Sequence, residues 1–243
     1  MNQTIVVFGA TSAIAKEYCR LKAQQNQFVL IARDQGALDD LTKDLIARQA
    51  QGVRTLKYDF ENIADLGSLI NEAFSSPVDV ALFAYGFLPD ENKCKADVTY
   101  LERFHRANIT SNMILLNLVA EKMKNQRKGS IAFITSVAGD RGKSSNYHYG
   151  SAKSAISRFL QGLRQSLFRD GVHVLDIRPG FVDTPMTVNF EKGPLWASPS
   201  SVARGIDRAI LSHKSVSYLP FFWRYIMLII RMIPEAIFKR MKL

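Results

Sequence analysis

Cysteine and histidine are scarce in this chain of 243 residues, which has only two cysteines and four histidines. The single pair, Cys19 and Cys94, is too little for a disulfide framework and fits a reducing cytoplasm better than secretion. The histidines show no metal-ligand spacing, so we predict no metal site. The first apolar run follows no basic region and is too short for a signal peptide. We therefore expect a cytoplasmic protein.

Acidic residues are also few, since 22 Asp and Glu face 32 Lys and Arg and leave a formal charge of +10. A basic protein can bind nucleic acid, membrane phosphates or a phosphorylated substrate. The cations are scattered along the chain and form no nucleic-acid-binding motif, so we predict no nucleic-acid partner.

No apolar run is long enough to span a bilayer. The richest one, residues 221–233, is interrupted by Arg224 and Arg231 and is followed by Pro234. Its aromatic, aliphatic and cationic residues are typical of an amphipathic helix that lies in a membrane interface. Packing in an oligomer interface or over the active site is an equally good interpretation. We treat residues 220–243 as an amphipathic tail that associates peripherally with the inner face of the membrane or covers another surface.

The remaining pattern is an alternation of short apolar β-rich runs with helical stretches. It has no internal repeat and no linker, and α/β folds of this length form single domains. We predict one domain over residues 1–243, with an α/β, Rossmann-like, doubly wound parallel sheet of about seven strands and helices on both faces. The predicted strands are 4–8, 27–32, 53–58, 78–84, 129–135, 172–178 and 215–219.

Tyr149 and Lys153 lie at positions i and i+4 and therefore share one helix face. A lysine cation ~4 Å from a phenol could lower its pKa from about 10 by up to ~3 pH units. The pair is thus a candidate proton shuttle, whereas Tyr147 has no lysine four residues on. Ser136 ends the predicted strand 129–135, at the edge where parallel sheets bind ligands.

A phosphate-binding turn is predicted at the start of the chain. The strand 4–8 leads into Gly9-Ala10-Thr11-Ser12-Ala13-Ile14-Ala15 and then into a helical stretch that ends near residue 25. Backbone N–H groups and the dipole of such a helix favour a pyrophosphate.

Together these residues resemble the short-chain dehydrogenase/reductase family, in which a glycine-rich turn precedes a Ser, Tyr, Lys triad. The serine and tyrosine are 149 − 136 = 13 residues apart here, close to the family's spacing. Further matches follow in order along the whole chain: Asp59-Phe60, Ala84-Tyr85-Gly86, Asn108 and the run Pro179-Gly180-Phe181-Val182-Asp183-Thr184.

The resemblance implies a nicotinamide cofactor, a homodimer or homotetramer, and two sets of site residues. The expected catalytic residues are Asn108, Ser136, Tyr149 and Lys153. The expected cofactor-binding residues are Gly9, Thr11, Ser12, Ala13, Ile14, Arg33, Asp59, Phe60, Ala84, Tyr85, Gly86, Tyr149, Lys153, Pro179, Gly180, Val182 and Thr184.

Three positions depart from the family pattern. Ala13 and Ala15 replace glycines of the turn, and their methyl groups are expected to weaken pyrophosphate binding. Tyr85 replaces a small residue and is expected to reshape the wall of the cofactor or substrate site.

The choice of nicotinamide cofactor rests on Arg33, which follows the second predicted strand. An acid near this position suits the ribose hydroxyl of NAD, whereas an arginine accommodates the 2′-phosphate of NADP. We predict NADP(H), although the adjacent Asp34 favours NAD(H).

The predicted activity is NADPH-dependent reduction of a ketone to a secondary alcohol, with residues 184–197 as a mobile substrate lid or a plain surface loop. The second half of the chain, including Asp140-Arg141 and the tail, also resembles the decaprenylphosphoryl-2-keto-ribose 2-reductase branch, which implies a polyprenyl-phosphate-linked keto-sugar. The alternatives are a reductase of a 3-oxoacyl or other small carbonyl substrate and a non-catalytic cofactor sensor.

Overall fold

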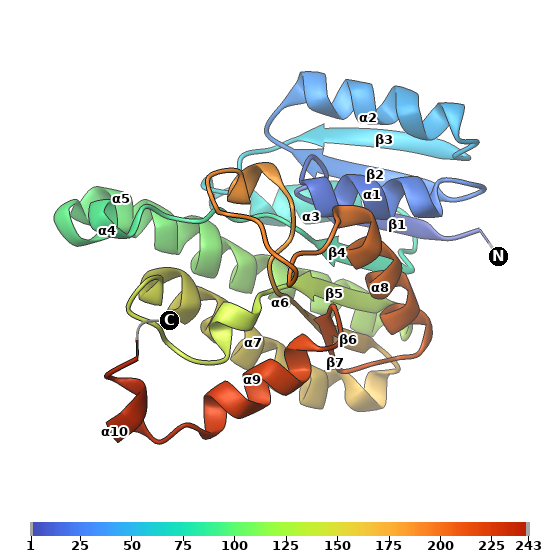
Figure 1. Ribbon diagram of the computed structural model, residues 1–243. Helices are drawn as coiled ribbons and strands as arrows, with labels where there is room; N and C mark the ends of the chain where they lie inside the picture. Colours follow the sequence, from blue (N-terminus) through green and yellow to red (C-terminus); the bar gives the residue numbers. More distant parts are fainter. Residues whose placement is uncertain (1, 242–243) are drawn as a thin grey trace.

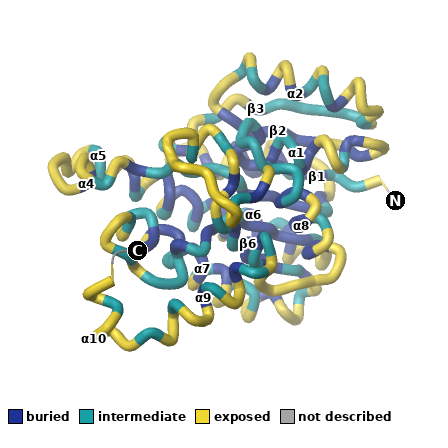
Figure 2. The backbone as a smooth tube through the Cα atoms, in the orientation of Figure 1, coloured by how far each residue is buried: buried dark blue, intermediate teal, exposed yellow. Residues whose placement is uncertain are grey.

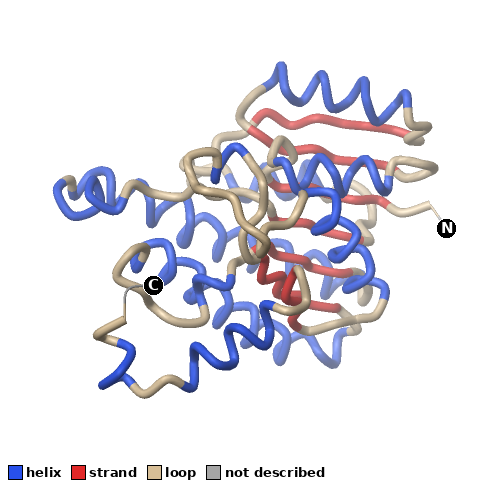
Figure 3. The backbone as a smooth tube through the Cα atoms, viewed as in Figure 1, coloured by secondary structure: helices blue, strands red, loops and turns tan. Residues whose placement is uncertain are grey.

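The computed structural model describes residues 2–241 and forms a single parallel sheet with helices on both faces (Figures 1 and 3). The strand order is β3-β2-β1-β4-β5-β6-β7, and every pair is parallel. The predicted fold class and all seven predicted strands are confirmed, with boundaries that shift by at most two residues. The strands are β1 Thr4–Phe8, β2 Gln27–Ala32, β3 Gly52–Lys57, β4 Val80–Phe83, β5 Ser130–Ile134, β6 His173–Pro179 and β7 Val216–Leu219.

The central strands are buried on both faces because they are continuous apolar runs rather than alternating ones, whereas the edge strands β3 and β7 are only partly buried. Along β1, Ile5 and Val7 face one core while Val6 and Phe8 face the other. The first core lies under α1 Ala13–Lys22, α2 Gln35–Ala47 and α8 Pro199–Leu211. The second lies under α3 Leu66–Ala73, α6 Ser111–Gln126 and α7 Tyr147–Leu167. The central strands are mostly dark blue in Figure 2, the colour of buried residues, whereas β3 at the edge of the sheet is mostly teal.

Strand order reverses beside β1, because β2 and β3 extend the sheet to one side and β4 to β7 extend it to the other. Open α/β sheets bind their ligands at the carboxyl ends of the strands at such a point. The loops after β1, β2, β4 and β5 therefore meet at one edge.

The remaining elements are short helices and turns and the C-terminal tail. α4 Glu91–Ala96 and α5 Val98–His105 project from the body (Figure 1), and a π-helical turn, Arg106–Thr110, joins α5 to α6. Single 3₁₀ turns occur at Val137–Gly139, Phe168–Asp170 and Pro185–Thr187. The tail forms α9 Trp223–Met232 and α10 Glu235–Phe238, separated by Pro234. Across residues 2–241, no helix has both the length and the apolar character needed to cross a bilayer.

Candidate active site

A cleft of about 410 Å³ opens at the carboxyl edge of the sheet. Its lining contains Ser136 and every residue that we predicted to bind the cofactor, from Gly9 in the first turn to Thr184 in the loop after β6. The structure adds residues that carried no motif of their own but flank those that did: Ala32, Glu61, Phe87, Ala107, Ile134, Thr135, Pro185, Met186 and Thr187.

The turn between β1 and α1 presents the start of a helix to this cleft. Gly9 has φ +81°, and a β-carbon there would lie 2.6 Å from the Tyr85 Cβ. The Ser12 hydroxyl caps α1 by accepting a hydrogen bond from the Ala15 N–H at 3.2 Å. The remaining N–H groups of the first helical turn are available to an anion, so the turn fits a pyrophosphate.

Of the two alanines that replace family glycines, only Ala13 lines the cleft. Ala15 is fully buried and packs in the core beneath α1. The expectation that its methyl group would weaken pyrophosphate binding is therefore wrong, because that methyl group points into the protein.

Tyr85 is the third departure from the family pattern. Its ring stacks on Phe60, with 3.9 Å between centroids and 16° between planes, and its hydroxyl hydrogen-bonds to that of Ser111 at 3.0 Å. Tyr85 lines the cleft and joins the loop after β4 to the loop after β3 by this aromatic stack, while its effect on the shape of the cofactor or substrate site stays a prediction.

Arg33 extends from the end of β2 and is largely exposed. Its guanidinium lies 3.6 Å from the Glu61 carboxylate. The neighbouring Asp34 accepts a hydrogen bond from the Ala37 N–H at 3.0 Å and so caps α2. Arg33 lines the cleft and Asp34 is not among the lining residues, which favours NADP(H) over NAD(H).

Ser136, Tyr149 and Lys153 meet in the cleft as the sequence predicted. A hydrogen bond joins the hydroxyls of Ser136 and Tyr149. The Lys153 ammonium group donates to the Ile134 carbonyl oxygen at 3.1 Å and lies 5.7 Å from the centre of the Tyr149 ring. The carboxyl end of β5 and one face of α7 thereby hold a serine, a phenol and an amine together.

The predicted electrostatics of the pair differ from what the structure gives. Burial raises the pKa of Tyr149 to about 12, and the Ser136 hydrogen bond lowers it only in part. Burial also lowers the pKa of Lys153 to about 8, with Asp176 opposing that change. The predicted lowering of the Tyr149 pKa toward neutrality is not seen, because burial is the largest cause of its shift and Lys153 is not among the causes.

Asn108 lies within the π-helical turn, a distortion that often marks functional positions. Its Oδ1 accepts a hydrogen bond from the Phe87 N–H, and its Nδ2 donates to the Phe104 carbonyl oxygen, both at 3.1 Å. Gly86 separates it from the lysine: a β-carbon at Gly86 would lie 2.6 Å from Asn108 Oδ1 and 3.9 Å from Lys153 Nζ. Asn108 is thus a near neighbour of Lys153, behind the residues that line the cleft.

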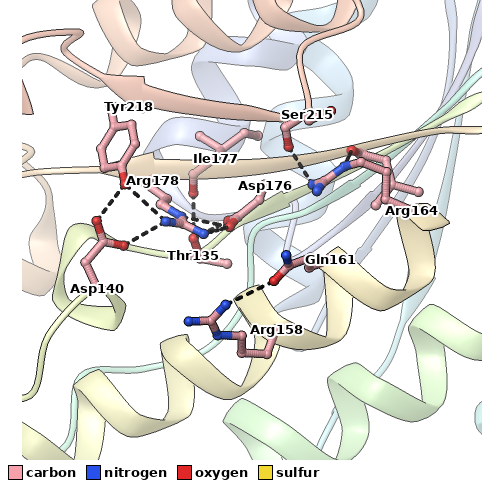
Figure 4. A network of polar contacts seen from close by, with 11 residues as sticks. Thr135, Asp140, Arg158, Gln161, Arg164, Asp176, Ile177, Arg178, Ser215 and Tyr218 are labelled. Carbon is pink, nitrogen blue, oxygen red and sulfur yellow. Dashed lines mark hydrogen bonds and ion pairs between the residues drawn. The ribbon is translucent and has the colours of Figure 1, made fainter. Parts of the chain in front are cut away.

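A buried network of charges, absent from our sequence-based predictions, includes Thr135, the residue before Ser136 (Figure 4). The Thr135 hydroxyl donates to Asp176 at 2.5 Å. Arg178 joins Asp176 and Asp140 through contacts of 2.7 and 2.9 Å. The Tyr218 hydroxyl donates to the second oxygen of Asp140 at 2.6 Å. The network ties the segment around the serine to β6 and β7.

The tail docks beside the loop that follows β6. The Phe181 ring stacks on Trp196 at 5.4 Å and meets Trp223, at the start of α9, edge-on at 5.6 Å. Several apolar side chains of the predicted lid are exposed, namely Met186, Val188, Phe190 and Leu195. Trp196 of the lid and Trp223 of the tail therefore both contact the ring of Phe181. The mobility of the lid stays a prediction.

Known proteins resemble this chain in sequence and in fold. The model of the short chain dehydrogenase family matches residues 3–194. An uncharacterized oxidoreductase of Mycobacterium tuberculosis is 33% identical over 239 residues, which cover 98% of this chain and 96% of the relative. A ketoacyl reductase of Nostoc is 26% identical over 217 residues, covering 86% and 75%. A short-chain dehydrogenase from Sphingobium yanoikuyae, solved in complex with NADPH, superposes with a TM-score of 0.84 at 21% identity, covering 99% and 96%.

The match to the family model and the relative that spans nearly the whole chain agree with the fold and with the cleft. This chain belongs to the short-chain dehydrogenase family and is an NAD(P)-dependent oxidoreductase.

Proposed function

We propose that this protein reduces a ketone to a secondary alcohol with NADPH. The observation that carries the proposal is the meeting of Ser136, Tyr149 and Lys153 in one cleft that also contains the start of α1. A proton donor, a hydrogen-bond donor and an anion site are the parts that carbonyl reduction needs.

The bound cofactor supplies the hydride. The Tyr149 phenol is the proton donor, and its pKa of about 12 keeps it protonated at neutral pH, the form that reduction requires. The Ser136 hydroxyl orients and polarises the substrate carbonyl. Lys153 holds the ribose hydroxyls, and Asn108 holds the water through which the tyrosine regains its proton; both roles follow the family resemblance.

NADPH rather than NADH is proposed because Arg33 reaches the cleft while Asp34 caps α2. A guanidinium binds a phosphate through paired charge-assisted hydrogen bonds. The Sphingobium neighbour, solved with NADPH, supports the same choice.

Replacing Tyr149 with phenylalanine tests the proposal, because it preserves the ring and removes the proton. Turnover of a ketone is expected to fall by ~10² or more while NADPH binding stays within about twofold. Tyr147→Phe is the matched control, since Tyr147 lies on the same helix two residues away and is exposed; its turnover should match that of the wild type. Normal turnover in Tyr149→Phe would contradict the proposal.

We propose further that the ketone is membrane-borne, such as a polyprenyl-phosphate-linked keto-sugar. One face of α9 exposes Tyr225, Leu228, Ile229 and Met232, a spacing that forms a continuous apolar stripe. Exposed cations lie beside this stripe and in the segment after α10: Arg224, Arg231, Lys239 and Arg240. An apolar stripe flanked by cations is complementary to an anionic membrane surface.

Vesicle flotation tests this membrane contact, which would lie at the inner face of the cytoplasmic membrane. The wild type should float with vesicles that contain anionic phospholipid, and Ile229→Glu should bind them at least about tenfold more weakly. Val98→Glu, a substitution of an exposed apolar residue on α5, is the control. Equal flotation of Ile229→Glu and the wild type would refute the membrane contact.

A 3-oxoacyl substrate is the second candidate, favoured by the similarity to the Nostoc ketoacyl reductase. Parallel assays of a 3-oxoacyl thioester and a lipid-linked keto-sugar distinguish the two by kcat/KM. Native mass spectrometry of the purified protein would also identify a retained nucleotide or lipid, and would test the predicted homodimer or homotetramer.

A further inference from the structure

Three charged side chains meet at the end of the cleft formed by the loops after β2 and β3. Arg103, on α5, holds the Glu61 carboxylate through two hydrogen bonds of 2.7 and 2.9 Å. Arg33 contacts one oxygen of the same carboxylate at the longer distance of 3.6 Å. Arg33 and Glu61 line the cleft, whereas Arg103 is not among its lining residues.

Glu61 presents a difficulty for a site that takes a 2′-phosphate. A carboxylate within 4 Å of Arg33 repels the phosphate and also competes for the guanidinium that would bind it. The carboxylate stays ionised, because Arg103 holds the pKa of Glu61 below its usual value.

The geometry offers a solution to this difficulty. Arg103 grips both oxygens of Glu61, whereas Arg33 makes a single longer contact and its side chain is 62% exposed. Exchanging a long, exposed ion pair for a phosphate costs little, since such surface pairs contribute little to stability. The bidentate pair is the stronger one and keeps Glu61 neutralised while Arg33 turns to the ligand.

We infer that Arg103 determines cofactor specificity without touching the cofactor: by holding Glu61, it releases Arg33 to bind the 2′-phosphate of the nucleotide. The inference rests on the NADPH preference proposed above and adds a positioning residue to it. Glu61 is the group through which Arg103 acts, so removing Glu61 should remove the need for Arg103.

Calorimetric binding of NADP⁺ and NAD⁺ in the absence of substrate tests this inference. Arg103→Gln should weaken NADP⁺ binding about fivefold, the size expected for interactions among partly exposed charges, and leave NAD⁺ binding within about twofold. Arg103→Lys should restore part of the loss, because it keeps the charge but not the planar fork. Arg48→Gln is the matched control, since Arg48 is a similarly exposed arginine that pairs with Asp44 on α2; it should change neither affinity more than twofold.

The double variant Glu61→Gln/Arg103→Gln decides whether Arg103 acts through Glu61. In the Glu61→Gln background, Arg103→Gln should have no further effect on NADP⁺ binding. A fivefold loss that persists in that background, or an equal loss for both nucleotides in Arg103→Gln alone, would overturn the inference and leave the proposed NADPH preference standing. Tighter binding of NAD⁺ than of NADP⁺ by the wild type would overturn both.

Discussion

Two clusters of charged side chains lie near the cleft, one next to Ser136 and one at Arg33, and they differ in solvent exposure. The cluster behind Ser136 places Asp140 and Asp176 at side-chain exposures of 2% and 1%, with Arg178 between them at 17%. In the cluster beside Arg33, the two arginine side chains are 62% and 54% exposed. The side chains of the buried cluster are held in one arrangement. In the exposed cluster, Arg33 can exchange its contact with Glu61 for a contact with a ligand.

This difference corresponds to two tasks. Reaction chemistry needs a serine, a tyrosine and a lysine held within a fraction of an ångström, and low dielectric surroundings make misplaced charges costly. Recognition of a 2′-phosphate needs a cation that can move to meet the ligand. The same residue types therefore act as a rigid support in one place and as an adjustable contact in the other.

The largest expected effect is a loss of stability when the arginine of the buried cluster is replaced by methionine, compared with the same replacement in the exposed cluster. Arg178→Met leaves two buried carboxylates without their cation and should lower the free energy of unfolding by about 3–5 kcal/mol. Arg103→Met removes an exposed partner and should cost about 1 kcal/mol or less. Urea unfolding followed by circular dichroism measures both, and similar losses in the two variants would show that burial does not distinguish the clusters.

The second effect concerns Lys153, whose charge the buried cluster supports through Asp176. Its pKa of about 8 lies below the ordinary value of 10.5, so between those pH values the unfolded chain binds more protons than the folded one. Lys153 should therefore contribute an increase in the free energy of unfolding across this window, by up to roughly 3 kcal/mol, and Lys153→Met should lack this contribution. Urea unfolding at pH 7, 8, 9 and 10 measures the difference between the two proteins.

Tyr149 affects the pH dependence of stability above the range of that experiment. Its pKa of about 12 exceeds the ordinary value of 10.0, so above pH 10 the unfolded chain loses the phenolic proton first and stability falls. Because burial also raises the pKa of Tyr18 and of Tyr85, Tyr149→Phe should keep the Lys153 contribution below pH 10 and make the fall above it smaller. Parallel pH curves for the wild type and Lys153→Met would mean that Lys153 keeps its ordinary pKa in the folded protein.

Sequence patterns were enough to place the strands and the cleft because both depend on local signals. Runs such as Ile5 to Phe8 are apolar enough to require burial on two faces, and the first turn and the Tyr149 helix carry their chemistry within a few residues. The contacts between Glu61 and Arg103, 42 residues apart, and between Asp140 and Tyr218, 78 residues apart, depend on the tertiary fold. No local pattern predicts such pairs.

The error in the Tyr149 pKa has a related cause. Spacing places Tyr149 and Lys153 on one helix face, but it does not say how deeply either is buried or which partner the ammonium group chooses. The structure directs Lys153 to the Ile134 carbonyl oxygen and buries both groups, and desolvation then dominates. The identity of a site can thus be read from spacing, whereas its proton affinities need the surrounding atoms.

A smaller effect than those of Arg178 and Lys153 is expected at Arg141, which follows the buried Asp140 in sequence and contacts the tail. Its guanidinium donates to the carbonyl oxygens of Ile230 and Ile233 at 2.6 Å each, and it lies 3.7 Å from the centre of the Phe238 ring. A cation at the carboxyl end of α9 also interacts favourably with the helix dipole.

Arg141→Met should loosen this end of the tail by about 1–2 kcal/mol, because it leaves these carbonyl groups without their charged donor. Hydrogen–deuterium exchange of peptides that cover residues 226–238 should accelerate, while peptides from α2 stay unchanged. Arg141→Lys should lie between the two, since lysine keeps the charge but loses the planar fork. Unchanged exchange in Arg141→Met would contradict this prediction. It would show that Arg141 does not hold the tail and that the contact between Phe181 and Trp223 is sufficient.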